Sequence, residues 1–351
     1  MTHLFGNRTR LLLLAVLVTV AASCGAPHER FARPAVPELY EPDFPPQVDP
    51  PVVRLSDGER SIVLIGTIHS VPAEYSDRLL DLSPELYEHI DTADSVLVES
   101  DLVTIDPIQR VIVTMEVTRA HEEPDREDGR PSLEEKIENR SDRNGDISSR
   151  IASSFDEAER REIEEIAQLR PWAARRRIND LFRDESEVEW ESGLDNHIAE
   201  RARRSGVDLD HLEQWEELAE LQDNADQEPY VRAILFTLEA DVDRDLMMRT
   251  RSNHELALVE RWSRSDLTGS ETTIYEDLNV DVPESVLEAW SDYDSIIFEA
   301  RERIWADRIL DRIERDEVDR MVVAVGASHL VDDRAILLEL LAEAGFEERA
   351  R

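Results

Sequence analysis

Three short apolar runs, each bounded by turn residues, stand out from an otherwise polar chain. They extend from Ser61 to Gly66, from Ser95 to Glu99 and from Arg320 to Val325, and they are rich in β-branched residues. Runs of this length and composition are typical of strands that are buried on both faces of a parallel sheet. Apolar residues at helical spacing lie between the first two runs, from Tyr75 to Ile90. The order strand, helix, strand predicts a βαβ unit with parallel strands.

The rest of the pattern is mostly helical. The centre of the chain, from Phe155 to about Arg264, repeats apolar positions with a helical period. We therefore expect an α/β fold with a mostly parallel central sheet flanked by helices, and a large helical middle segment between the N-terminal and C-terminal βα units. The further elements that we expect are short strands at Val52–Leu55 and Val207–Leu212, and helices at Ala158–Phe182, Gly193–Ser205, Trp215–Gln222, Ser295–Arg315 and Arg334–Ala344.

Two polar segments interrupt this pattern. Residues 25–52 hold eight of the 16 prolines, which is typical of a stiff, extended tether. Residues 121–150 are crowded with charged residues, Pro, Gly and Asn, and they predict a flexible, acidic insertion on the surface. We therefore divide the chain into a signal peptide at 1–23, a tether at 24–52 and a domain at 53–351.

The N-terminus resembles an export signal. Arg8 and Arg10 precede an apolar run from Leu11 to Ala22, which is shorter than the roughly 20 residues of a membrane-spanning helix. Small residues then lead to Cys24, and the stretch is similar to a bacterial lipobox. We expect a lipoprotein of the bacterial cell envelope that is anchored to a membrane through Cys24, faces the periplasm and favours the outer membrane. An ordinary cleaved signal with an incidental cysteine is the alternative.

Composition excludes several classes of protein. The 40 basic and 80 acidic residues give a net charge of −40, which disfavours nucleic acid as a partner because the phosphate backbone is repelled. A single cysteine excludes an intramolecular disulfide framework and a cysteine-rich zinc module. Any metal site in this chain must therefore consist of histidine and carboxylate ligands.

Residues suited to such a site follow the three apolar runs. His69 follows Gly66-Thr67-Ile68, His329 follows Gly326-Ala327-Ser328, and Glu99 ends its own strand. Ligands of parallel sheets bind outside the carboxyl ends of the strands, so we expect the three side chains to converge there. Imidazoles and a carboxylate suit Zn, Mn, Co or Fe, and three protein ligands leave a position open for water. Glu99 could be either a metal ligand or the general base.

These residues resemble the TraB/GumN superfamily, which includes the pheromone-shutdown proteins TraB and PrgY and the Tiki metalloproteases. The resemblance rests on the two Gly-x-x-His turns and the Glu that ends a strand, and it covers roughly residues 60–350. Other stretches support it in the same order along the chain: Pro171-Trp172, Gly193-Leu194-Asp195 followed by His211-Leu212-Glu213, Glu299 to Ala306, and Val323 to Leu330.

The resemblance implies a metal-dependent hydrolase, most directly a peptidase, with a divalent ion such as Mn, Co or Zn and a peptide or protein substrate. His69, Glu99 and His329 would form its core, and Arg301 would support it by stabilising an oxyanion or holding a substrate carboxylate. Arg301 lies one helical turn before Trp305 and is expected to share its inward face.

Further observations qualify this interpretation. Glu213 and Asp101 are additional candidates for the site. Glu302 stands where the family usually has Asn, so the substrate or the rate is expected to differ if that Asn touches the substrate. Two alternatives remain: a binding protein of the same fold that sequesters a peptide or cofactor, and an esterase or other hydrolase on a related fold.

Overall fold

The structure is a computed structural model. It describes residues 36–45, 47–76, 79, 84–104, 131–138, 151, 155–182, 188–240, 242–267, 278, 280–315, 318–331 and 335–349. The expected signal peptide, Cys24 and the first part of the expected tether lie outside the described residues. The described residues belong to one compact unit, which begins at Val36.

A six-stranded sheet forms the centre of this unit, with the order β6-β4-β7-β2-β1-β8. The four strands from β6 to β2 pair in parallel, whereas β1 pairs antiparallel with β2 and β8. The prediction of a mostly parallel sheet is therefore confirmed, and β7 from the C-terminal part lies between β2 and β4. The strands are β1 Val52–Ser56, β2 Ser61–Thr67, β4 Ser95–Ser100, β6 Asp208–Glu213, β7 Arg320–Gly326 and β8 Glu347–Glu348, and a second sheet pairs β3 Ser70–Pro72 with β5 Trp190–Ser192.

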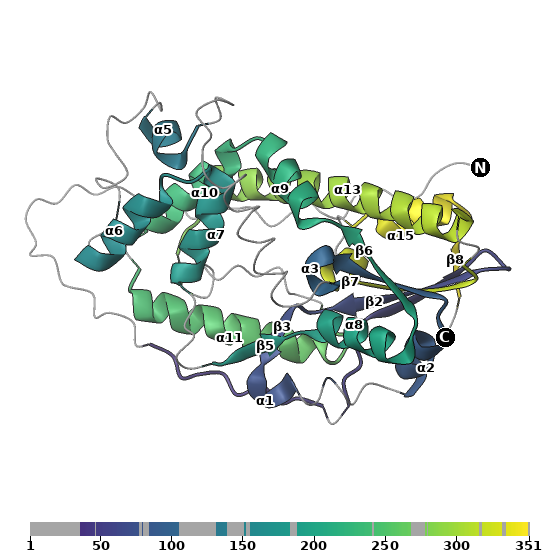
Figure 1. Cartoon of the computed structure of the whole chain (residues 1–351). Helices are drawn as coiled ribbons and strands as arrows, with labels where there is room; N and C mark the ends of the chain where they lie inside the picture. The colour runs from purple at the N-terminus through teal and green to yellow at the C-terminus, as the bar shows by residue number, and fades with distance from the viewer. Residues whose placement is uncertain are drawn as a thin grey trace, which may run out of the picture. The chain divides into compact units, whose positions relative to one another are not determined.

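Helices cover both faces of the sheet (Figure 1). Helices α2 (Pro84–Thr92), α8 (Leu194–Ser205) and α11 (Arg244–Trp262) pack on one face. Helices α13 (Glu284–Arg315) and α15 (Leu337–Glu343) pack on the other. The apolar strands are buried on both sides because each face contributes alternate residues to a separate core. The carboxyl edge of the sheet therefore lies between α8 and α13.

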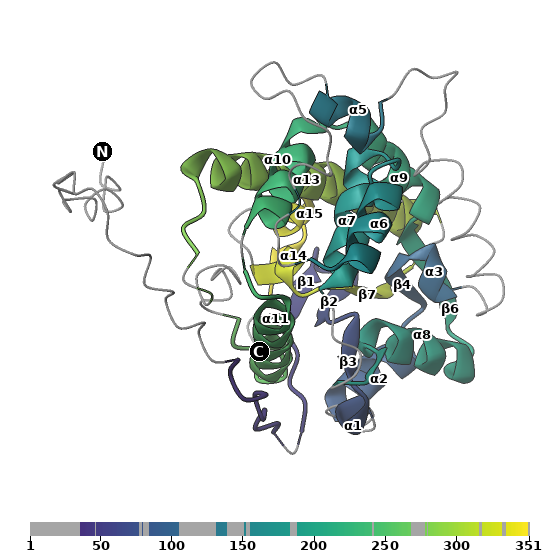
Figure 2. The same cartoon turned by 90° about the vertical axis from the view of Figure 1, so that its left-hand side faces the viewer.

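The helices of the middle segment pack around a third core. Figure 1 draws these helices beyond one end of the strands, and Figure 2 views them from that end. Where one helix was predicted from Ala158 to Phe182, the chain forms two, because Pro171 begins a new helix after an extended residue. The further helices here are α5 Leu133–Glu138, α6 Glu157–Ile166, α7 Pro171–Leu181, α9 Trp215–Asn224 and α10 Glu228–Glu239, while α1 Ala73–Ser76, α3 Asp101–Thr104 and α14 Ser328–Val331 are single turns beside the sheet.

Part of the predicted acidic insertion is not a solvent-exposed loop. Within residues 121–150, the structure describes residues 131–138, and α5 there buries Leu133 and Ile137 completely. The two side chains are four residues apart and so share one helix face, which packs into the third core. The remainder of the insertion lies outside the described residues.

The described part of the proline-rich segment lies along α11. Val48 is buried, the Asp49 amide donates to the Ser263 carbonyl at 2.9 Å, and Phe44 stacks on Tyr75 with 3.8 Å between ring centroids. The carbonyl of Pro51 accepts a hydrogen bond from the Gly66 amide at 2.8 Å, at the end of β2. The described residues of this segment therefore pack against the folded domain. Of the helices in the described ranges, none has the length and apolar character needed to span a bilayer.

Candidate functional site

His69, Glu99 and His329 meet at the carboxyl edge of the sheet, above Gly326. The parallel pairing of β2 with β7 puts Thr67 beside Gly326, so the two Gly-x-x-His turns leave the sheet side by side. A methyl group on Gly326 would lie 3.4 Å from Glu99 Oε2, 3.6 Å from His329 Cδ2 and 3.7 Å from His69 Nε2. The space above the Gly326 α-carbon is therefore bounded by all three side chains.

The His69 turn is held by the start of α8. Gly193 donates its N–H to the His69 carbonyl at 2.8 Å, and a β-carbon on Gly193 would lie 1.7 Å from the Ile68 carbonyl oxygen. Only glycine fits this approach. It brings Asp195, which is buried, to within 3.4 Å of His69 Nδ1, measured from Oδ2. The hydrogen bond that His69 donates to Asp195 raises the pKa of His69 to about 9; burial opposes this shift, and the charge of Glu99 adds to it. The His69 side chain nevertheless remains 60% exposed.

The His329 turn is buried and more tightly held. The ring lies parallel to Phe298 at 3.8 Å between centroids, and Trp305 contacts it at 4.4 Å. Nδ1 of His329 is 2.7 Å from Oε1 of Glu302, whose carboxylate is completely buried. Glu302, which stands where the family usually has Asn, therefore contacts the candidate histidine and not solvent.

Glu99 is an ionised carboxylate with both oxygens engaged. Oε1 pairs with Arg301, and Oε2 accepts a hydrogen bond from the Gly326 amide at 2.8 Å. Burial raises the pKa of Glu99, but the positive charge of Arg301, the two histidines and the Gly326 amide outweigh it and lower that pKa to about 2. Glu99 is thus negatively charged at neutral pH, in a site where only His69 is well exposed.

Arg301 connects Glu99 to Glu213. Its Nε is 3.0 Å from Glu213 Oε2 and its Nη2 is 2.6 Å from Glu213 Oε1. Trp305 donates its indole N–H to the same carboxylate at 3.1 Å and lies under the guanidinium, with Cζ 4.7 Å from the ring centroid. Burial raises the pKa of Glu213, although the hydrogen bond and charge of Arg301 lower it. Burial lowers the pKa of Arg301, but the carboxylates of Glu99 and Glu213 outweigh it and raise that pKa. Among the described residues, Nη1 of Arg301 has no hydrogen-bond partner.

The structure gives Asp101 a contact at the start of α9 and adds two residues that the sequence reasoning did not select. Asp101 Oδ1 accepts the Trp215 amide at 3.0 Å, at the start of α9. The added residues are Asp195 and Glu302, the carboxylates on the two histidines. A signal for Glu302 exists, because it lies four residues after Phe298 and three before Trp305 on one helix face.

Within the described ranges, no group of three or more His, Cys, Asp or Glu side chains is already arranged to hold a metal ion. Arg301 and the Gly326 amide contact the two Glu99 oxygens, each of which keeps a further lone pair. The donor types nevertheless suit a borderline divalent ion. Each imidazole is held at Nδ1 by a buried carboxylate, the usual arrangement of a metal-bound histidine.

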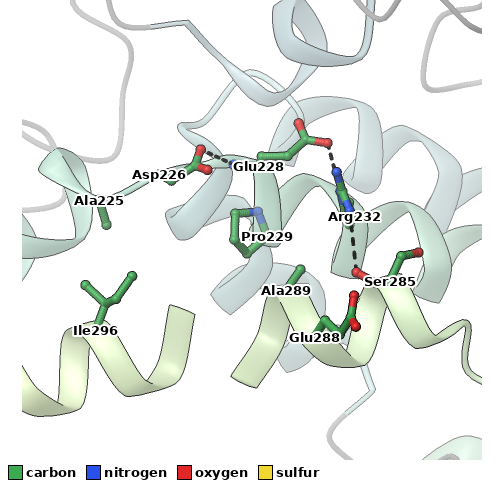
Figure 3. A pocket seen from close by; sticks show the side chains of 9 residues that line it. All are labelled: Ala225, Asp226, Glu228, Pro229, Arg232, Ser285, Glu288, Ala289 and Ile296. Atoms are coloured by element: carbon green, nitrogen blue, oxygen red, sulfur yellow. Dashed lines mark hydrogen bonds and ion pairs between the residues drawn. The ribbon is translucent and has the colours of Figure 1, made fainter. Parts of the chain in front are cut away.

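Two hollows lie away from these residues. One hollow, with a volume of about 320 Å³, lies between the start of α10 and the first turns of α13 (Figure 3). Arg232, which lines it, pairs with Glu228. The other, of about 630 Å³, lies between the proline-rich segment and the residues after β3. None of the predicted site residues lines either hollow.

Comparisons with curated proteins and with solved structures found no match to this chain. A family model does match: that of the TraB/PrgY/gumN family, over residues 51–349. This range includes both histidine turns, Glu99, Glu213 and the helix that carries Arg301 and Glu302. The matched region is most of the chain, and the protein therefore belongs to the TraB/PrgY/gumN family.

Proposed function

We propose that this protein is a metal-dependent hydrolase of the cell envelope that cleaves peptide bonds. One observation carries the proposal. Two imidazoles, each held at Nδ1 by a buried carboxylate, turn their other edge toward one space above Gly326, beside the ionised Glu99. Family membership supports it, because the matched range contains all of these residues.

The donor atoms for the ion would be Nε2 of His69, Oε2 of Glu99 and Nε2 of His329. Two ligands about 2 Å from one tetrahedral ion lie roughly 3–3.5 Å apart. His69 Nε2 and Glu99 Oε2 are 3.7 Å apart, so a small adjustment of the exposed His69 side chain suffices for this pair. A bound Mn, Co or Zn ion supplies Lewis-acid catalysis and lowers the pKa of a water ligand.

Glu99, His69 and Arg301 would have different roles in this reaction. A general base works best with a pKa near the operating pH, and the pKa of Glu99, at about 2, is far below it. This favours the role of ligand for Glu99 over that of base. His69 is the exposed member of the group and marks the side from which a substrate enters. Arg301 holds Glu99 in place and retains Nη1 for an oxygen of the substrate.

A second candidate is a non-catalytic protein that binds a peptide or cofactor in the envelope. The observation that favours it is the closed charge network, because Arg301 and the Gly326 amide satisfy Glu99 without any ion. In that case His69 and Arg301 Nη1 would contact a bound ligand, and the pair of histidine turns would serve recognition.

Metal content and thermal melting separate the two candidates. Purified protein is expected to contain a divalent ion, and adding Mn, Co or Zn at 100 times its Kd should stabilise it by about 2.7 kcal/mol. His211→Ala is the matched control, because His211 also pairs with an aspartate, Asp210, but lies on β6, which β4 separates from β7 and Gly326. Protein without metal, whose melting is unaffected by all three ions, would refute the hydrolase proposal.

Glu99→Gln then separates the two roles of Glu99. If Glu99 is a ligand, the variant should lose both the ion and the cleavage of a peptide library. If it keeps the ion and loses cleavage, Glu99 is the base.

The envelope location rests on the N-terminal sequence, where Cys24 follows the apolar run. Radiolabelled palmitate should enter the wild-type protein and not Cys24→Ser, and the variant should leave the membrane fraction. Equal labelling of both proteins would contradict a lipid anchor at Cys24.

A further inference from the structure

The buried carboxylate of Glu302 accepts three hydrogen bonds at once. Oε1 faces His329 Nδ1 at 2.7 Å, and Oε2 accepts the backbone N–H groups of Ile336 at 2.5 Å and Leu337 at 3.0 Å. Two backbone N–H groups already donate to this carboxylate, and its Oε1 is placed to accept a third hydrogen bond, so the geometry puts the proton of this contact on Nδ1 of His329. We infer that Glu302 is a positioning residue that selects the Nδ1–H tautomer of His329 and leaves Nε2 with a free lone pair.

The other contacts of His329 fix the plane of the ring but not its protonation. Phe298 stacks on it with 10° between the planes, and Trp305 contacts it at a tilt of 57°. Neither partner faces Nδ1 with a hydrogen-bond acceptor. Cδ2, to which Nε2 is bonded, lies on the edge facing Gly326. Glu302 therefore determines which nitrogen is unprotonated and which way it faces.

The same carboxylate connects the ring to α15. Ile336 precedes that helix and Leu337 is its first residue, and both N–H groups are free of intrahelical partners, as at the start of any helix. Glu302 on α13 is thus fixed by α15 on one side and fixes His329 on the other. A side chain that served only to satisfy α15 would leave the tautomer of His329 undetermined.

Glu302→Gln tests this directly, because Gln has the same length but only one acceptor oxygen. That oxygen is required by the two backbone N–H groups, so the side-chain NH₂ must face Nδ1 of His329 and donate to it. The proton of His329 is then expected to move to Nε2. Nitrogen NMR of the metal-free protein at pH 8 reads this out, since protonated and unprotonated imidazole nitrogens resonate far apart. The signals of His329 are assigned by their loss in His329→Gln.

The wild-type spectrum is itself decisive, even if Glu302→Gln does not fold. Nδ1 should be protonated and Nε2 unprotonated. A proton on Nε2, or on both nitrogens, would overturn the inference, and so would a folded Glu302→Gln with an unchanged pattern. The matched control is Glu299→Gln, less than one turn earlier on α13, where the carboxylate is half exposed and pairs with Arg303. It should leave the His329 signals unchanged.

A second measurement rests on the proposed function. Loss of a carboxylate behind a metal-bound histidine typically lowers metal affinity about 10- to 100-fold. Calorimetry with Zn²⁺ should show this loss in Glu302→Gln and not in Glu299→Gln. If the wild type binds no Zn²⁺, the proposed function fails while the tautomer result stands. If the tautomer changes and the affinity does not, His329 Nε2 is not a ligand, and the role of Glu302 is limited to positioning the ring.

Discussion

On each of the two sides of the candidate site, a histidine pairs with a buried carboxylate, but one histidine is buried and the other is exposed. On the α13 side, His329 is 2% exposed, stacks on Phe298, contacts Trp305 at a tilt and lies 2.7 Å from its carboxylate. On the α8 side, the His69 side chain is 60% exposed and lies 3.4 Å from its carboxylate. The buried histidine is fixed by packing, whereas the exposed one depends on a backbone turn that Gly193 supports.

The difference shows how one site combines rigidity with access. Packing fixes a side chain more firmly than a single solvent-exposed hydrogen bond does, because buried contacts cannot exchange with water. The α13 side therefore gives the site its shape, and the α8 side leaves it open to a substrate or ion. Changes on the α13 side should mainly affect stability, and changes on the α8 side should affect binding with little loss of stability.

The largest effect is expected for Arg301→Met on the α13 side. The change leaves Glu99 and Glu213 buried without their shared counter-charge, and breaking a buried ion pair costs about 3–5 kcal/mol. Urea unfolding at pH 7 measures the loss. As the pH falls, the loss should begin to shrink above pH 4.5, the ordinary pKa of a glutamate, because burial without Arg301 raises the pKa of the stranded carboxylates and they take up protons there. Arg303→Met removes an exposed pair with Glu299 and should cost at most about 0.5 kcal/mol. Equal losses of unfolding free energy in Arg301→Met and Arg303→Met would contradict the burial of the Arg301 ion pairs.

His329→Ala and His69→Ala compare the two histidines directly. His329→Ala creates a cavity and leaves Oε1 of Glu302 without its partner, so about 3 kcal/mol of unfolding free energy should be lost. His69→Ala removes an exposed ring and should cost about 1 kcal/mol or less. Under the proposed function, both variants lose the metal. Urea unfolding together with metal analysis checks the pair. Normal metal binding in either variant would remove that histidine from the ligand set.

Gly193→Ala perturbs the α8 side without replacing either histidine. Its β-carbon would overlap the Ile68 carbonyl, so the His69 turn must move, at about 1–3 kcal/mol. Gly206→Ala is a control at the other end of α8. The added carbon there makes no contact, although the left-handed backbone of Gly206 disfavours alanine. Both variants should lose stability, but only Gly193→Ala should lower metal affinity. If Gly206→Ala lowers metal affinity equally, the affinity depends on the stability of α8 and not on the position of the His69 turn.

Much of the sheet could be predicted from the sequence because its strands are short, continuous and apolar. The turn residues after β2 and β7 also located His69 and His329, since the carboxyl ends of parallel strands share one edge. The position of β7 between β2 and β4 depends on contacts between distant parts of the chain, which local periodicity does not encode. The buried α5 escaped prediction for the opposite reason: two apolar residues among many charged ones give a weak helical signal.

The partners of the histidines were harder to predict. Asp195 lies 126 residues from His69, and a lone aspartate in the first turn of a helix is commonly an ordinary favourable charge. Glu302 was noticed only because it follows Arg301 at a position where the family usually has Asn. Its contact with His329 depends on how α13 crosses the turn after β7, which the sequence does not show.

The smallest expected effect concerns the pH dependence of the α8 side. In the folded protein, Asp195 raises the pKa of His69 from 6.5 to about 9. The charged pair therefore stabilises the fold fully below pH 6.5, and this stabilisation is lost as the pH rises through 9. Because His69 is 60% exposed, solvent limits the stabilisation to about 1 kcal/mol or less.

Asp195→Asn should return the pKa of His69 toward 6.5, which an NMR titration of its ring protons follows. Unfolding measured from pH 6 to pH 10 should show the variant less stable below pH 6.5 and approaching the wild type above pH 9. Asp210→Asn, beside the partly exposed His211, controls for the loss of one carboxylate. A stability difference that persists unchanged above pH 9 would mean that Asp195 acts on the first turn of α8, whose N-terminus favours a negative charge at any of these pH values. The exposed side of the site would then be held by its backbone alone, and the 3.4 Å contact between Asp195 and His69 would have no energetic role.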